Sequence, residues 1–153
     1  MKLEQTQFLT WRHILFLRVR FLLLGIDFEI AEIITGVIAL GGGLVWLNPF
    51  VDTFVTSQNY AAMRGLPGVF GGEGFWGALA IGLGLLTLLA LFTGRVRGRR
   101  WAMLGLILFY CFIGVSFFAS NPWSWGFVQV AVLLAVSLWA QWRLALLPRP
   151  SWM

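Results

Sequence analysis

Three carboxylates open one of the apolar segments of this chain, and they are the residues best placed to do chemistry. Asp27, Glu29 and Glu32 lie at the start of a run that is otherwise uncharged. An ionisable group inside a membrane-spanning segment is by default a candidate for binding a proton or a cation. At about 100° per residue, Glu29 and Glu32 share one helix face with Gly36 and Gly43. Glu32 is therefore the candidate intramembrane acid.

A structural interpretation of the same carboxylates is open and is the one we favour. Acidic side chains are stabilised near a helix N-terminus by the helix dipole, and Arg18 or Arg20 is available as a counter-charge. No carboxylate lies at mid-depth in any apolar segment, so a proton or ion relay starting at Glu32 has no second step.

Other chemistry finds few residues to use. His13 is the single histidine and Cys111 the single cysteine. A di-iron helical bundle needs Glu-x-x-His pairs, and the chain has none. Neither a P-loop spacing nor a nucleophile elbow is present. We therefore predict a non-enzymatic protein with no catalytic residue, no cofactor and no metal site.

The composition places these residues in a membrane. Of the 153 residues, 59% are hydrophobic and 11% are charged, and the mean hydropathy is +0.85. Soluble domains carry roughly a quarter of charged residues, and a soluble fold of this length could not cover so much apolar surface. We expect one all-α domain with lipid as its solvent.

Four segments are long enough to cross the hydrocarbon core, which takes about 20 residues in a helix. They are residues 30–47, 75–93, 101–119 and 122–142, the last with Asn121 as its N-cap. Backbone groups in lipid must pair within their own segment, which favours helices. The apolar runs are continuous and not alternating, so a β-barrel is excluded.

Between the second and third segments lies a cluster of four arginines, Arg95, Arg97, Arg99 and Arg100. Cytoplasmic loops of membrane proteins carry an excess of Lys and Arg. Of the eleven cations, only Arg64 would lie on the opposite side, which leaves ten on the side of this cluster. We predict that both termini are cytoplasmic and that the four arginines are topology anchors in the bacterial inner membrane. The cluster is too short, and too poor in aromatic residues, for nucleic acid. The expected partners are membrane lipids and other membrane-embedded chains.

The remaining segments complete the predicted organisation. Residues 1–26 form a cytoplasmic segment whose apolar but arginine-bearing part, 8–24, is predicted to lie as a helix in the membrane interface. Residues 27–144 form the four-helix domain, and 145–153 form a cytoplasmic tail. The outer loop, 48–74, contains a short helix that Gly65 and Pro67 would end.

Tryptophans occur near both ends of the four segments, as in the aromatic belts of membrane proteins. Trp46, Trp76, Trp123 and Trp125 are expected at the outer interface, and Trp101, Trp139 and Trp142 at the inner one.

Small residues at a spacing of four allow close helix packing in lipid. The second segment contains two such pairs, Ala78 with Gly82 and Ala80 with Gly84, and the fourth contains one, Ala131 with Ala135. The predicted helix-packing positions are Gly36, Gly43, Ala78, Gly82, Gly84, Ala131 and Ala135. The sequence leaves open whether they pack within one bundle or between subunits.

The order of these features resembles that of small four-span membrane proteins encoded by tailed bacteriophages, over residues 28–144. The matching stretches are FEIAEIITGVIALGGGLVWLNP, DTFVTSQNYAAM, GRVRGRR, SNPWS and SLWAQWRL. The resemblance implies a protein of the host inner membrane, uncharacterised or holin-like. We expect a self-associating membrane protein with a holin-like or host-envelope role. The alternative is an accessory subunit that packs against a larger membrane complex, and a small transporter is a third, less favoured hypothesis.

Overall fold

The computed structural model describes residues 28–50 and 52–146. The predicted interfacial helix at 8–24, its turn into the first span, Arg18, Arg20 and most of the predicted tail lie outside the described residues.

Four helices form the body of the protein: α2 (Phe28–Trp46), α5 (Glu73–Phe92), α6 (Val96–Ser120) and α7 (Trp125–Ala145). All four are long and apolar enough to cross a membrane. The 20 residues of α5 span about 30 Å at 1.5 Å per residue, which is the thickness of a bilayer core. The prediction of an all-helical protein with four candidate spans is confirmed.

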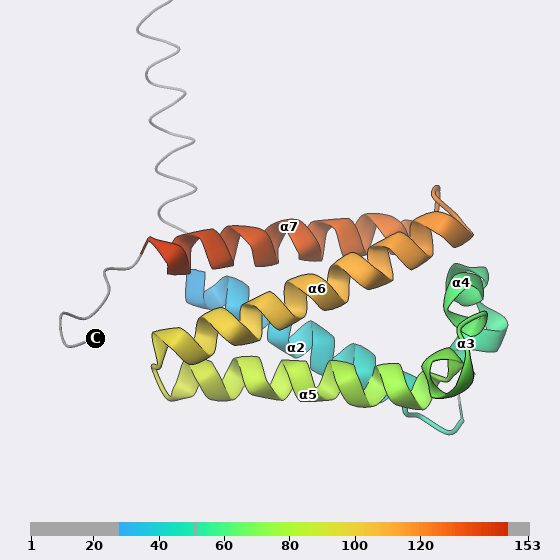
Figure 1. Ribbon diagram of the computed structural model, residues 1–153, viewed down its shortest axis with the longest axis horizontal. Coiled ribbons are helices and arrows are strands. Elements are labelled where there is room, and N and C mark those ends of the chain that lie inside the picture. Colours follow the sequence, from blue (N-terminus) through green and yellow to red (C-terminus); the bar gives the residue numbers. More distant parts are fainter. Residues whose placement is uncertain (1–27, 51, 147–153) are drawn as a thin grey trace, which may run out of the picture.

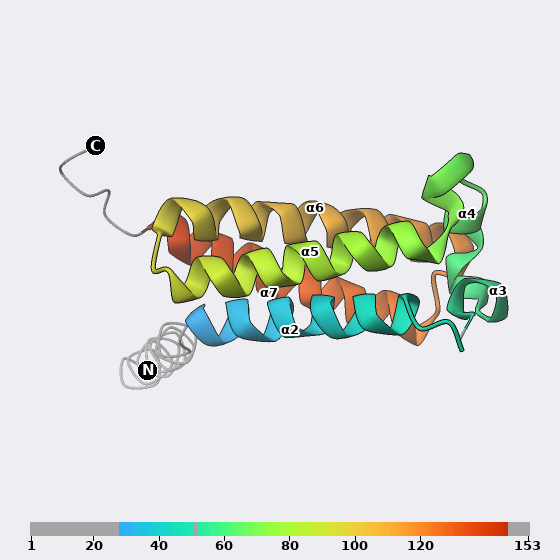
Figure 2. The same ribbon diagram turned by 90° about the horizontal axis from the view of Figure 1, so that it is seen from below.

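The four helices pack in the ring order α2–α5–α6–α7 (Figures 1 and 2). Helices α5 and α7 lie at opposite corners of the bundle, while α2 and α6, across the other diagonal, touch only locally. Helices α2 and α6 begin at the end that carries Arg95–Arg100, which we call the arginine end. The other end, covered by the segment between α2 and α5, is the loop end.

The closest helix contact joins α2 to α5 and is made by glycines. A Cβ atom on Gly43 would lie 2.7 Å from the carbonyl oxygen of Gly77. About two helical turns nearer the arginine end, a Cβ on Gly84 would lie 2.7 Å from the carbonyl oxygen of Gly36. Real side chains do not tolerate such distances to backbone atoms, so this glycine seam requires residues without a Cβ. It lets the two backbones approach where dispersion, and not water, drives association.

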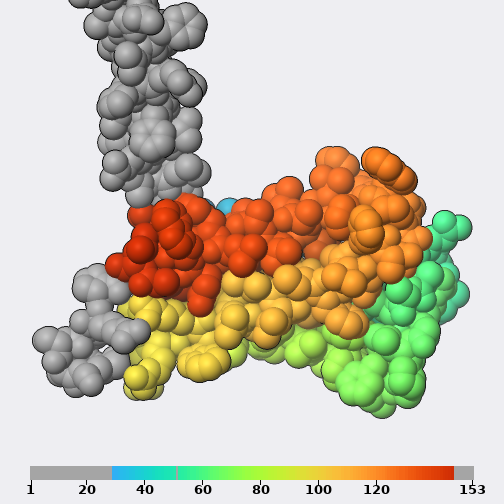
Figure 3. All heavy atoms as spheres, turned by 45° about the horizontal axis from the view of Figure 1, so that its top comes forward, coloured from blue at the N-terminus to red at the C-terminus, as the bar shows by residue number. Residues whose placement is uncertain are grey.

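The interior is formed mainly by one side of α6, whose opposite side stays exposed. Met103, Leu106 and Ile113 on α6 are fully or almost fully buried, whereas Leu108 and Val115 are mostly exposed. Figure 3 shows α6 and α7 side by side along one face of the molecule. An apolar interior and an equally apolar exterior are what a helix bundle in lipid requires.

Two helix starts differ from the predicted ones by three residues or more. Helix α6 begins at Val96 and not at residue 101, because the turn from α5 needs only three residues and Gly94 supplies its positive φ of 65°. The arginines that follow are good helix formers. Helix α7 begins at Trp125, because the hydroxyl of Ser124, and not the side chain of Asn121, accepts the N-capping hydrogen bond, from the Phe127 N–H at 3.1 Å.

The segment between α2 and α5 folds over the loop end. It contains α3 (Thr53–Thr56), η1 (Gln58–Tyr60), α4 (Ala61–Arg64) and η2 (Gly68–Gly71). Ser57 caps η1, and Gly65 ends α4. The Ala62 N–H donates to the hydroxyl of Ser120 at 3.0 Å, which ties the segment to the end of α6. The N–H of Phe54 donates to the carboxylate of Glu73, which ties it to the start of α5.

Candidate functional site: a buried ion pair between α2 and α6

The predicted intramembrane acid, Glu32, is buried against an arginine of α6. The Nε of Arg99 donates to Oε2 of Glu32 at 2.8 Å, and Nη2 lies 2.7 Å from the same oxygen. Nη1 donates to Oε1 of Glu29 at 3.2 Å. Glu32 is 1% exposed and Arg99 is 6% exposed, whereas the side chain of Glu29 is about half exposed.

Both elements place their charges at the arginine end for simple geometric reasons. Glu29 and Glu32 are three residues apart, so they lie one above the other on the face of α2 that is turned to α6. Arg99 lies in the first turn of α6, at the same depth. The planar guanidinium offers several donors in a fixed fork, which suits contact with two carboxylates at once.

The second carboxylate oxygen of Glu32 differs from the first in its surroundings. Oε1 of Glu32 is buried and accepts no hydrogen bond among the described residues. A buried carboxylate oxygen left without a partner is unfavourable unless a proton, a water molecule or another group satisfies it. Glu32 is therefore held as the buried member of an ion pair with Arg99, and a role in binding a proton stays a prediction.

A second polar contact joins the same two helices further into the bundle. The hydroxyl of Tyr110 on α6 donates to the carbonyl oxygen of Thr35 on α2 at 3.0 Å. That carbonyl lies one turn beyond Glu32, and the Thr35 hydroxyl donates to the Ala31 carbonyl at 2.8 Å. The ion pair and this hydrogen bond are thus polar contacts between two helices that otherwise touch only locally.

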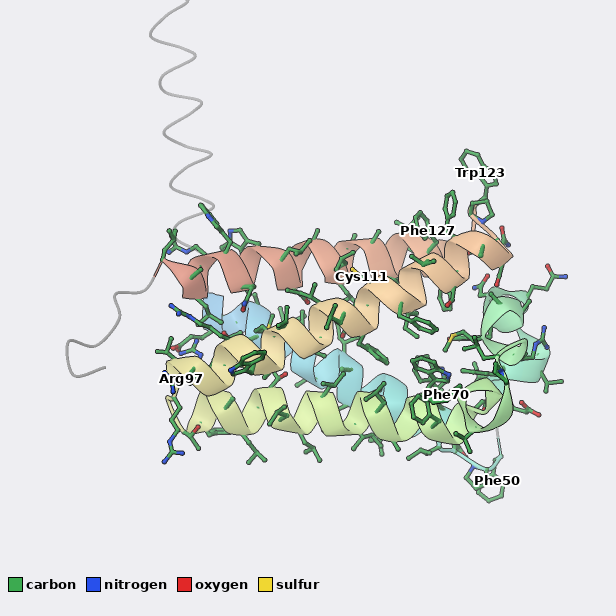
Figure 4. All side chains as sticks on the ribbon, viewed as in Figure 1. Phe50, Phe70, Arg97, Cys111, Trp123 and Phe127 are labelled. Atoms are coloured by element: carbon green, nitrogen blue, oxygen red, sulfur yellow. The ribbon has the colours of Figure 1, made fainter. Side chains whose placement is uncertain are left out.

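The four arginines predicted as topology anchors have different surroundings in the structure. Arg99 enters the ion pair, and Arg100 donates through Nε and Nη2 to the carbonyl oxygen of Leu144, at 3.2 and 2.7 Å. This contact satisfies a carbonyl in the last turn of α7, where a cation also complements the helix dipole. Arg95 and Arg97 are exposed at the start of α6, and Figure 4 shows Arg97 at this end of the molecule.

The sequence identified Glu29 and Glu32 but not their partner. The counter-charges it suggested, Arg18 and Arg20, lie outside the described residues. A signal for Arg99 was present, since a helix extended back to Val96 places this arginine at the depth of Glu32. Because the third span was predicted to begin at residue 101, Arg99 was assigned to the preceding loop and not to the helix.

The predicted helix-packing residues fall into two groups. Gly36, Gly43 and Gly84 lie in the glycine seam between α2 and α5, together with Gly77, which the sequence analysis did not single out. The remaining members lie on the exposed outer faces of α5 and α7 and are Ala78, Gly82, Ala131 and Ala135.

The tryptophans also divide. Trp123 and Trp125 at the loop end are exposed, and Figure 4 shows Trp123 projecting away from the bundle. Trp101 at the arginine end is likewise exposed. Trp76, by contrast, is buried and donates to the Phe70 carbonyl at 2.7 Å. Trp46 donates to the Tyr60 hydroxyl at 3.3 Å. Trp46 and Trp76 thus take part in the packing under the outer segment, where each indole N–H has a partner inside the fold.

The fold and the cluster of charges define an all-helical, multi-pass membrane protein whose first and third spans are joined by a buried ion pair. Comparison with protein-family models, with curated proteins and with solved structures found no match to this chain.

Proposed function

We propose that the protein is a non-enzymatic component of the bacterial cytoplasmic membrane that associates with further copies of itself through the outer faces of α5 and α7. The holin-like or host-envelope role implied by the resemblance to phage-encoded four-span proteins is the setting we propose for this association. In this setting both termini and the arginine end face the cytoplasm.

The observation that carries the proposal is the exposure of small residues on these two faces. Gly82 on α5 has open space where a Cβ would be, and Ala78, one turn earlier, is exposed beside it. Ala131 and Ala135 are exposed on α7 in the same way. Small residues spaced by four on an exposed face let a second helix approach closely in lipid.

The position of the two faces favours assemblies larger than a dimer. Helices α5 and α7 lie at opposite corners of the bundle, so one copy can contact a neighbour on each side. Copies in one membrane share one orientation, and contacts between α5 of one copy and α7 of the next generate rings or open rows. The glycine seam is occupied within each copy and is not available for this contact.

Native mass spectrometry in mild detergent tests the proposal. The wild-type protein is expected as oligomers, and Gly82→Leu or Ala135→Leu is expected to shift it to smaller species, because a larger side chain holds the helices apart. Gly41→Leu is the matched control: Gly41 is exposed on α2, with open space at its Cβ, and lies on neither face.

A strictly monomeric wild-type protein would refute self-association. If that monomer co-purified with a larger partner from its native membrane, the accessory-subunit alternative would replace the proposal.

A further inference from the structure

A cavity of about 260 Å³ lies in the loop half of the bundle, between α2, α6 and α7. It exists because the glycine seam holds α2 against α5, while α2 and α6 touch only locally across the diagonal. Gly42 contributes to the space, since nothing lies within 4 Å of where its Cβ would be. Thr53 and Tyr60 of the outer segment close the cavity at the loop end.

The walls of the cavity are mainly apolar. They include Ala39 on α2, Ile113 and Phe117 on α6, and Val130 and Leu133 on α7. The volume exceeds the roughly 150 Å³ of an engineered apolar cavity that stays dry and binds benzene. It is close to the lower limit of about 300 Å³ for ligand pockets. Unfilled apolar space of this size forfeits dispersion contacts, so a hydrocarbon occupant is favoured over water.

The cavity opens sideways, toward the surface that faces lipid. Ile38 and Val45 on α2 line it and are nevertheless about half exposed, at 44% and 50%. Gln129 on α7 lines the other side and is also exposed. Residues that belong both to the lining and to the outer surface mark a mouth, which therefore lies between α2 and α7.

One polar atom at the closed end is left without a partner. The hydroxyl oxygen of Thr53 is buried and forms no hydrogen bond among the described residues. A hydroxyl in an apolar cavity is satisfied when an acceptor reaches it. The ester carbonyl of a membrane lipid is such an acceptor, and it lies at the interfacial depth of a bilayer, as the loop end does in a membrane-spanning bundle.

We propose that this cavity binds one acyl chain of a membrane phospholipid, which enters between α2 and α7 and whose ester carbonyl accepts a hydrogen bond from Thr53. The chain lies along the apolar walls with its terminal methyl pointing toward the arginine end. Phospholipid is the occupant because the mouth opens onto it directly and because the site combines mainly hydrocarbon walls with the unpaired hydroxyl of Thr53 at the loop end.

Photocrosslinking in vesicles tests the site. The full-length protein is reconstituted in phosphatidylethanolamine–phosphatidylglycerol vesicles that contain a phosphatidylglycerol with a diazirine on one acyl chain, and the labelled peptides are mapped. In the wild-type protein we expect labelling concentrated on the cavity walls, including Val130. Gly42→Phe should fill the cavity and reduce this labelling at least fivefold.

Gly41→Phe is the control for that variant, because Gly41 is adjacent, exposed and equally open at its Cβ, but does not line the cavity. It should leave the labelling unchanged. Equal labelling of Val130 in the wild-type, Gly42→Phe and Gly41→Phe proteins would overturn the proposal.

A second variant keeps the test decisive if Gly42→Phe unfolds. Thr53→Val keeps the shape of the side chain and removes the hydroxyl, so it should lower the labelling of Val130 several-fold with no change in circular dichroism. Unchanged labelling in Thr53→Val would refute the hydrogen bond to the lipid ester.

Discussion

Replacing Arg99 by glutamine should destabilise the bundle far more than replacing a neighbouring arginine. The change leaves Glu32, which is 1% exposed, without its counter-charge. Removing one partner of a buried ion pair costs about 3–5 kcal/mol, because the other charge stays buried and uncompensated. The contact with Glu29 adds little, since that carboxylate is half exposed and exposed pairs are screened to about 0–1 kcal/mol.

Reversible unfolding in mixed micelles, followed by circular dichroism as the fraction of denaturing detergent rises, measures this loss. Arg99→Gln is compared with Arg95→Gln, which removes the same positive charge from the exposed start of the same helix. Each variant removes one positive charge from the arginine cluster, so a difference between their free energies of unfolding measures the contribution of the ion pair. We expect about 3–5 kcal/mol for Arg99→Gln and within about 0.5 kcal/mol of wild type for Arg95→Gln.

A double-mutant cycle completes the experiment. Glu32→Gln alone should also be destabilising, because it leaves the buried guanidinium without its closest carboxylate. The double variant Glu32→Gln with Arg99→Gln leaves neither of the two charges behind, and it should lose less than either single variant. The coupling energy should then exceed the larger single loss, at about 3 kcal/mol or more. Equal losses for Arg99→Gln and Arg95→Gln would refute the reasoning, and so would strictly additive losses in the cycle.

Three further predictions concern orientation, packing and ionisation. With Cys111 replaced by serine, a cysteine at the exposed Gln58 should react with a membrane-impermeant maleimide added outside intact cells, and reaction only after rupture would invert the proposed topology. Gly84→Ala should destabilise the protein by about 1–3 kcal/mol, because its Cβ meets backbone across the glycine seam, whereas Gly41→Ala should not, and equal unfolding midpoints would contradict this. Burial raises the pKa of Tyr60, and this effect outweighs the opposite effect of its hydrogen bond from Trp46. Because the folded state then holds this proton more tightly than the unfolded state, stability should fall as the pH rises above about 10. The fall should be smaller in Tyr60→Phe when unfolding midpoints at pH 9 and 11 are compared.

The four spans were predictable because lipid sets their length and leaves a helix as the only way to pair the backbone. The residues at which the spans begin and end were harder to predict. The start of α6 at Val96 depends on a three-residue turn at Gly94, and arginines occur equally well in a loop and in the first turn of a helix.

The partners within the bundle were not predictable. In lipid both faces of a span are apolar, so the pattern of α5 does not reveal which face is turned inward. Gly77 and Gly84 face α2, whereas Gly82, only two residues from Gly84, faces outward. The contact between Glu32 and Arg99 spans 67 residues of sequence and depends on the ring order of the helices, which no local pattern encodes.

The two partners of the ion pair are synthesised at different times, which matters for how the first span enters the membrane. Glu32 leaves the ribosome 67 residues before Arg99, so at about 5–20 residues per second the carboxylate is present for several seconds before its partner exists. During that interval α2 carries an acid without its intramembrane counter-charge, and full insertion is opposed by the cost of burying it. Such a helix inserts either with a protonated carboxyl or after a delay at the headgroups. We therefore expect full insertion of the first span to depend on the arrival of α6 as well as on the hydrophobicity of α2.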